Sequence, residues 1–280
     1  MNRPRPTAGY AELDPCTRAI YCRALAALRD ARIPFLVGGA YAFARYTGIV
    51  RHTKDFDVFL HRRDVVRALD TLARAGYQTE LTFSHWLGKA YEGEDFIDVI
   101  FSSGNGVAEV DDTWFEYSIE DEVLGLPVLL CPAEEMLWSK AFVMERERFD
   151  GADVAHILRA RASGLDWPRL LRRFQDHWRV LLSHLILFGF VYPAERTLIP
   201  AEVMQELLGR LRDELDTASP CDRLCQGTLL SRAQYLDDLE REGYLDARRL
   251  PRGKMTDEAI ARWTAAIEEP RAASEPHDGR

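Results

Sequence analysis

The sequence predicts an α+β protein in which a unit of strands and helices is followed by a helical unit, with the boundary near residue 130. Three observations support this prediction. Short apolar runs of strand length dominate the first part of the chain, whereas after Cys131-Pro132 the apolar residues recur at helical spacing. The Gly38-Gly39 pair ends the first short run, and a helix-like segment then leads to a second run that carries two carboxylates.

The elements of the first unit follow from apolar spacing and from residues that begin or end helices. Asp14-Pro15 begins a helix, and Ile33-Pro34 ends it. Gly76 closes another amphipathic helix. We expect helices at 14–30, 40–46 and 63–75, and strands at 35–37, 77–83, 86–91, 95–101 and 126–130. A further strand carries Asp55 and continues through residues 57–60.

The second unit is predicted to be mostly helical. Pro132 suits a first helical turn, and Glu134 and Glu135 suit the positive end of the helix dipole. We expect helices at 133–148, 150–162, 167–177, 178–190, 201–216, 229–242 and 256–268, with a loop at 217–227. The chain therefore divides into a sheet-bearing domain at 1–130, a helical domain at 131–268 and a disordered tail at 269–280.

The composition is typical of a globular intracellular protein. Of the 280 residues 47% are hydrophobic, and the formal net charge of -9 means that the surface as a whole does not attract nucleic acid or acidic membranes. The N-terminus lacks the apolar core of a secretory signal, and the apolar run at 180–192 is shorter than a membrane span. The five cysteines show no disulfide framework. We expect a cytoplasmic protein without a membrane partner.

Three aspartates suggest the chemistry. Asp55 and Asp57 are separated by one residue in a strand, so their side chains point to the same face. Asp98 lies inside the apolar run 96–101, where an unpaired carboxylate is costly to bury. If the two strands are neighbours, the three acids can hold two Mg²⁺ ions of the kind that stabilise in-line phosphoryl displacement. Asp98 can also serve as the general base on an attacking hydroxyl.

The order of strand, glycine pair, helix, Asp-x-Asp and later acid resembles the motif of the nucleotidyltransferase superfamily that shares the DNA polymerase β palm fold. The matching positions are Gly38-Gly39, Asp55-Phe-Asp57 and Asp98. The Arg-x-Thr-x-Asp-x-Asp variant is most similar to AbiEii-type toxin nucleotidyltransferases and to antibiotic nucleotidyltransferases. The resemblance implies a polymerase β-like mixed sheet flanked by helices, a nucleoside triphosphate (NTP) substrate, and Mg²⁺ or Mn²⁺ bound by the three aspartates. Gly38 and Gly39 would let backbone N–H groups approach the phosphates.

The resemblance continues beyond the sheet. Residues 132–140 and 148–153 are similar to the helical segment that follows the palm in these families. By that resemblance Lys140 is a phosphate ligand, and Asp150 and Asp153 line the site or orient the lysine. Structural interpretations stay open, since Lys140 can be a solvated lysine and Asp150 can cap the following helix, with Asp153 in its first turn.

Four further features have both a functional and a structural interpretation. Arg51 either contacts the nucleotide or pairs with an acid, and Thr53 either takes part in the site or caps the turn into the strand. For His85 we favour a packed or exposed side chain over a contact with a base. The basic segment 169–179 would suit RNA backbone binding, but a solvated helix face is the commoner explanation.

The sequence thus predicts an enzyme that transfers a nucleoside monophosphate (NMP) from an NTP to an acceptor hydroxyl and releases pyrophosphate. The acceptor stays open between a small molecule, the 3′ end of a tRNA and a protein hydroxyl. A toxin role, with an antitoxin protein as partner, rests on the resemblance alone. Two alternatives remain. One is a non-catalytic nucleotide-binding or protein-interaction module on the same scaffold, which an Arg filling the cleft would favour. The other is a structural protein in which an Arg or Lys satisfies Asp98.

Overall fold

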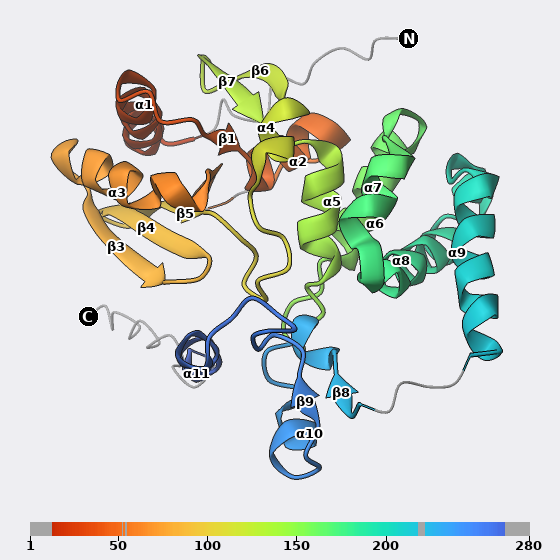
Figure 1. Cartoon of the computed structure of the whole chain (residues 1–280). Helices are drawn as coiled ribbons and strands as arrows, with labels where there is room; N and C mark the ends of the chain where they lie inside the picture. The colour runs from red at the N-terminus through yellow and green to blue at the C-terminus, as the bar shows by residue number, and fades with distance from the viewer. Residues whose placement is uncertain (1–12, 52, 54, 218–221, 267–280) are drawn as a thin grey trace, which may run out of the picture.

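A computed structural model describes residues 13–51, 53, 55–217 and 222–266 of the chain. Its centre is a seven-stranded mixed sheet with the strand order β3-β4-β5-β2-β1-β7-β6 (Figure 1). The strands are β1 (Leu36–Val37), β2 (Asp55–Phe59), β3 (Gln78–Phe83), β4 (Leu87–Glu92), β5 (Asp95–Ile100), β6 (Ile119–Val123) and β7 (Leu126–Leu130). The predicted α+β class, with a mixed sheet flanked by helices and a helical C-terminal region, is confirmed.

One face of the sheet is covered by α1 (Pro15–Asp30) and α3 (Val65–Arg74). Helix α1 begins as predicted, because the carboxylate of Asp14 accepts hydrogen bonds from the N–H groups of Cys16 and Thr17. On this face the ring of Tyr21 lies 5.1 Å from that of Phe56, which is fully buried. Because side chains alternate along a strand, the residues on either side of Phe56 point to the opposite face.

In Figure 1 helices α5 to α9 lie to the right of the sheet, and α10 and α11 lie below it. Helix α2 follows β1 directly, and α5 follows β7 and contacts α6 and α7. The helices are α2 (Gly39–Thr47), α4 (Asp112–Glu116), α5 (Ala133–Ala141), α6 (Gly151–Arg161), α7 (Trp167–Phe174), α8 (Trp178–Val191), α9 (Ala201–Leu215), α10 (Leu236–Glu240) and α11 (Asp257–Ala265).

The strand pairing places three polar side chains in one row. Strand β2 pairs in parallel with β5, and Asp57 lies directly beside Asp98. Strand β4 pairs with β5 in antiparallel orientation, and Lys89 lies on the other side of Asp98. Residues that are directly paired across a sheet share a face, so this row projects from the face opposite α1 and α3.

Helix α5 ends earlier than predicted. It stops at Ala141 instead of continuing to residue 148. The chain then makes a turn closed by the backbone hydrogen bond from Asp150 to Val143 and by the bridge between Met144 and Phe149. Within the turn Arg148 pairs with Asp150, which stabilises it. The apolar spacing of the sequence does not predict this ion pair.

The predictions also differ from the structure in other elements. The predicted helix 229–242 is reduced to α10, because the hydroxyl of Ser231 bonds to Glu145 and holds the preceding segment in a loop. Strand β6 and helix α4 were not predicted. Strand β6 is an edge strand with mostly exposed side chains, so it has no apolar run. The predicted tail at 269–280 lies outside the described residues.

The C-terminal segment returns to the sheet. Helix α11 contacts β3, and the ring of Trp263 packs edge-on against Phe83 and Trp86 at 4.9 and 5.3 Å. The side chain of Asn105 also donates to the carbonyl of Leu229 at 2.7 Å. The division into domains at 1–130 and 131–268 stays a proposal. None of the described helices has the length and apolar character needed to cross a membrane.

Candidate active site

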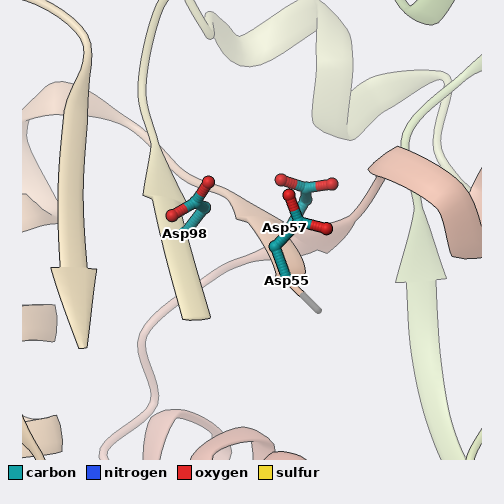
Figure 2. A group of neighbouring side chains, drawn as sticks. All are labelled: Asp55, Asp57 and Asp98. Carbon is teal, nitrogen blue, oxygen red and sulfur yellow. The ribbon is translucent and has the colours of Figure 1, made fainter. Parts of the chain in front are cut away.

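Three carboxylates converge on the face of the sheet opposite α1 and α3 (Figure 2). Asp55 and Asp57 extend from β2 and Asp98 from β5, and a ligand oxygen of each lies within 4.8 Å of the others. The parallel register explains this, because Asp57 and Asp98 are direct neighbours and Asp55 shares their face by alternation. The structure therefore brings together the three acids that the sequence singles out.

The cluster is electrostatically unfavourable without a cation. Burial raises the pKa of Asp57 from 3.8 to about 8, with the charges of Asp55 and Asp98 as the next causes. The positive charges of Lys140 and Arg148 act in the opposite direction. Burial also raises the pKa of Asp98. Three hard oxygen ligands on two paired strands fit Mg²⁺ or Mn²⁺, and a bound cation would favour the charged form of all three.

The glycine pair brings the start of α2 against Asp57. Gly39 is the first residue of this helix, and its φ of +53° lies in the region that favours glycine. A Cβ at Gly39 would overlap with Oδ2 of Asp57, and a Cβ at Gly38 would overlap with the ring of Phe59. The N-terminus of α2 therefore adjoins the carboxylate cluster, where its N–H groups can meet phosphate oxygens. The role of Gly38 and Gly39 in phosphate binding stays a prediction.

One cation of the site was not predicted. The ammonium of Lys89 on β4 lies 2.6 Å from Oδ1 of Asp98. Among the described residues, no Lys or Arg forms an ion pair with Asp55 or Asp57. A lysine thus does satisfy Asp98, as the structural alternative requires, but the other two carboxylates stay without such a partner. The sequence places a single cation in the strand 86–91, and only the register shows which acid it faces.

A second charged network adjoins the carboxylates. Lys140 on α5 lies 2.9 Å from Asp153 and 3.1 Å from Asp150, and its side chain is 18% exposed. Arg51 pairs with Asp153 at 2.5 Å, and Arg148 pairs with Asp150 at 2.9 Å. The interpretation of Lys140 as a solvated lysine is therefore wrong. Arg51 pairs with an acid, as one of its two interpretations expects.

Asp150 pairs with Lys140 and does not cap the following helix with its side chain. It occupies the N-cap position of α6, but its side chain accepts no hydrogen bond from that helix. Burial alone would raise the pKa of Asp150, but the hydrogen bond from Arg148 and the charge of Lys140 lower it below the usual value. Arg148 itself was not among the predicted site residues. It lies in the turn between α5 and α6, where the prediction had continued the helix.

The remaining candidates have mainly structural contacts. The hydroxyl of Thr53 donates to the carboxylate of Asp55 just before β2, which agrees with a role at the start of that strand. His85 is buried, and its Nε2 lies 3.0 Å from the carbonyl oxygen of Gly104, so of the packed and exposed possibilities the structure shows the packed one.

The basic segment 169–179 is not simply a solvated helix face. Arg169 is buried and pairs with Glu135 at 2.5 Å, and Arg173 pairs with Asp111 at 2.6 Å. These two arginines join α7 to α5 and to the residue before α4, so they are structural ion pairs. Arg172 and Arg179 of the same segment are exposed.

We expect the stability of the metal-free protein to fall as pH rises towards 8. The pKa of Asp57 is about 8 in the folded chain, against 3.8 as its ordinary value. Between these two pH values the folded state keeps the proton of Asp57, whereas the unfolded chain releases it. The contribution of this group to the free energy of unfolding is therefore complete below pH 4 and is lost as pH rises through 8. Denaturation in a chelator at pH 5, 6.5 and 8 should show this decline for the wild type and a smaller one for Asp57→Asn. Parallel pH profiles would contradict the prediction.

No family model matches this sequence, and a search of curated proteins finds no match. Among solved structures, the chain is similar to ANT(2″)-Ia in complex with adenylyl-2″-tobramycin, at 16% identity and a TM-score of 0.38, over 70% of this chain and 99% of the other. It is similar to the lincomycin-bound lincosamide antibiotic adenylyltransferase LnuA, at 14% identity and a TM-score of 0.36, over 50% and 94% of the two chains.

A third similar structure is an antigenic nucleotidyltransferase-like protein from Paracoccidioides brasiliensis, at 14% identity and a TM-score of 0.42, over 66% of this chain and 93% of the other. These names belong to the class of protein that the glycine and aspartate motif resembles. Similarity at this level does not transfer an activity, so the function proposed below rests on the geometry of the site.

Proposed function

We propose that this chain is a metal-dependent nucleotidyltransferase that transfers NMP from an NTP to an acceptor hydroxyl. One observation carries the proposal, the direct pairing of Asp57 with Asp98 in the parallel register, with Asp55 on the same face. Two of the three carboxylates have no cationic partner among the described side chains. Such a cluster is costly unless a function requires it.

The residues of the site have separate roles in an in-line displacement. Asp55, Asp57 and Asp98 would hold one or two Mg²⁺ ions, which supply charge stabilisation to the attacking and leaving oxygens. Asp98 accepts the proton of the acceptor hydroxyl as that oxygen forms a bond to the α-phosphorus. The bond from the α-phosphorus to the bridging oxygen breaks, and pyrophosphate leaves with that oxygen. The N-terminus of α2 orients the phosphates.

Lys140 and Arg148 supply the positive charge for the leaving group in this proposal. Both are held by Asp150, and both act electrostatically on Asp57. Neutralising a developing charge with preorganised cations is usually worth several kcal/mol of transition-state stabilisation. Arg51, which is paired with Asp153 on the same network, is the third candidate cation.

Lys140→Ala should lower kcat/KM for the NTP by about 10²-fold, because one preorganised cation is lost. Arg148→Ala should act in the same direction with a smaller effect, since its side chain is 68% exposed. Steady-state transfer rates at varied NTP measure both effects. Arg159→Ala, which removes the surface pair between Arg159 of α6 and Glu195, is the matched control and should keep the wild-type rate. An active Lys140→Ala variant with unchanged kcat/KM would contradict this assignment.

Transfer itself is tested with the full chain, Mg²⁺ and each of the four NTPs labelled at the α-phosphate. Total tRNA, the protein itself and a panel of hydroxylated antibiotics serve as acceptors, because the acceptor class is still open. Label that moves to an acceptor with the wild type and not with Asp57→Asn supports the proposal. A toxin role and an antitoxin partner stay secondary proposals, for which growth arrest on expression of the wild type but not of Asp57→Asn is the test.

The alternative of a non-catalytic module makes a different prediction. It expects Mg²⁺-dependent NTP binding without transfer to any acceptor. The Lys89–Asp98 pair favours the other alternative, a structural protein in which a lysine satisfies Asp98. Arg51 and Arg148 are instead held by Asp153 and Asp150, so neither arginine pairs with the three carboxylates.

A further inference from the structure

The position of Lys89 has a consequence for cation binding. Its ammonium lies 2.6 Å from Oδ1 of Asp98, and its side chain is 19% exposed. The ammonium also lies 4.1 Å from the centre of the Phe96 ring, which favours a cation at this position. Two independent contacts therefore hold the charge of Lys89 at the edge of the carboxylate cluster.

Lys89 has no competing acidic partner across the strand. Glu80 faces it on β3, but the carboxylate of Glu80 accepts hydrogen bonds from the hydroxyls of Tyr91 and Thr82, at 2.8 and 2.9 Å. No ion pair joins Lys89 to Glu80 in this part of the sheet. The ammonium of Lys89 therefore pairs with Asp98, which is also the third candidate ligand for the divalent cation.

A fixed positive charge beside a cation site opposes the cation. When all three carboxylates are ionised they carry a formal charge of −3, and the ammonium of Lys89 reduces it to −2. Asp98 pairs through Oδ1, and Oδ2 stays available to a metal ion or to the acceptor hydroxyl. The ammonium thereby selects which oxygen of Asp98 faces the site.

We propose that Lys89 is a built-in counter-ion of the carboxylate cluster, which weakens divalent-cation binding to the free protein and orients Asp98. This inference rests on the proposed function for the identity of the cluster as a metal site. Its consequence is a coupling between nucleotide and metal. The negative charge of a triphosphate outweighs the single charge of Lys89, so the metal binds tightly only together with the NTP.

The test measures Mn²⁺ affinity by titration calorimetry on the full chain without nucleotide. Lys89→Met should tighten Mn²⁺ binding by about tenfold, because one charge close to the site is removed. Lys89→Gln keeps a hydrogen-bond donor towards Asp98 without the charge and should show the same tightening if the Met variant does not fold. Lys89→Arg keeps the charge and should stay near the wild-type affinity. Lys254→Met, which removes a surface lysine paired with Glu109, is the matched control and should also match the wild type.

A purely structural role for Lys89 would lower thermal stability without tightening Mn²⁺ binding. Equal Mn²⁺ affinity of the folded wild type and the folded Lys89→Met or Lys89→Gln variant therefore overturns the counter-ion role, even if the wild type transfers NMP. Tighter binding by either variant supports that role, even if transfer to every acceptor fails and the proposed function is lost. Absence of Mn²⁺ binding to all of these proteins overturns the counter-ion role, whereas the proposed function is decided by the transfer assay with NTP present.

Discussion

Asp57→Asn is expected to reduce NMP transfer by about 10³-fold or more and to stabilise the metal-free protein at the same time. Transfer is lost because the cluster loses the Asp57 carboxylate, one of its three anionic metal ligands. The gain in stability has a different cause. Burial and the two neighbouring carboxylates disfavour the charged form of Asp57 and raise its pKa to about 8. Replacing that carboxylate with a neutral amide removes like-charge repulsion from the folded state.

The measurement is a transfer rate together with a denaturation curve in a chelator at pH 8 or above. Asp95→Asn is the matched control, because Asp95 lies on β5 only three residues before Asp98 but bonds to the hydroxyl of Thr17 of α1. We expect that variant to keep transfer activity. An Asp57→Asn protein that is both active and less stable than the wild type would refute the interpretation of the cluster as a metal site.

Gly39→Ala is expected to reduce transfer by about 10²-fold, although no charged group is removed. A Cβ at this position would overlap with Oδ2 of Asp57, so the carboxylate or the start of α2 has to move. A displacement of about 1 Å at a reacting centre costs rates of this order. The positive φ of +53° adds a strain of about 1 kcal/mol for a residue with a Cβ.

Gly48 provides the control for that strain. It is the C-cap of the same helix, it also has a positive φ, of +75°, and a Cβ there would meet nothing within 4 Å. Gly48→Ala should therefore cost about 1 kcal/mol of stability and leave transfer intact. Comparison of the two variants by transfer rate and Mn²⁺ affinity separates the overlap with Asp57 from the backbone strain. Similar transfer rates for the two variants would show that Asp57 does not need its present position.

The local features of the site were accessible from the sequence because their signals are local. Asp55 and Asp57 are two residues apart, and strand alternation alone puts them on one face. Asp98 is conspicuous because it interrupts an apolar run. The glycine pair marks a break between a strand and a helix wherever the two lie in the fold. These signals led to the three acids that the structure brings together.

The charged partners of those residues could not be predicted from the sequence in the same way. Lys89 faces Asp98 through the antiparallel register of β4 and β5, and a shift by one residue would turn it to the other face. Arg148 adjoins the site because α5 ends at Ala141, which depends on contacts across the turn to Asp150. Lys140 was singled out through the resemblance, and its spacing in the chain alone would have left it a solvated lysine.

The sequence by itself determined the α+β class, the order of its strands and helices up to β5, and the acids on β2 and β5, because these depend on residue type and short-range spacing. The tertiary structure alone decided which charges meet. It paired Asp98 with Lys89, tied Lys140 to Asp150 and Asp153, and brought the C-terminal segment back to β3. Contacts between residues far apart in the chain depend on register and packing, and these are properties of the whole fold.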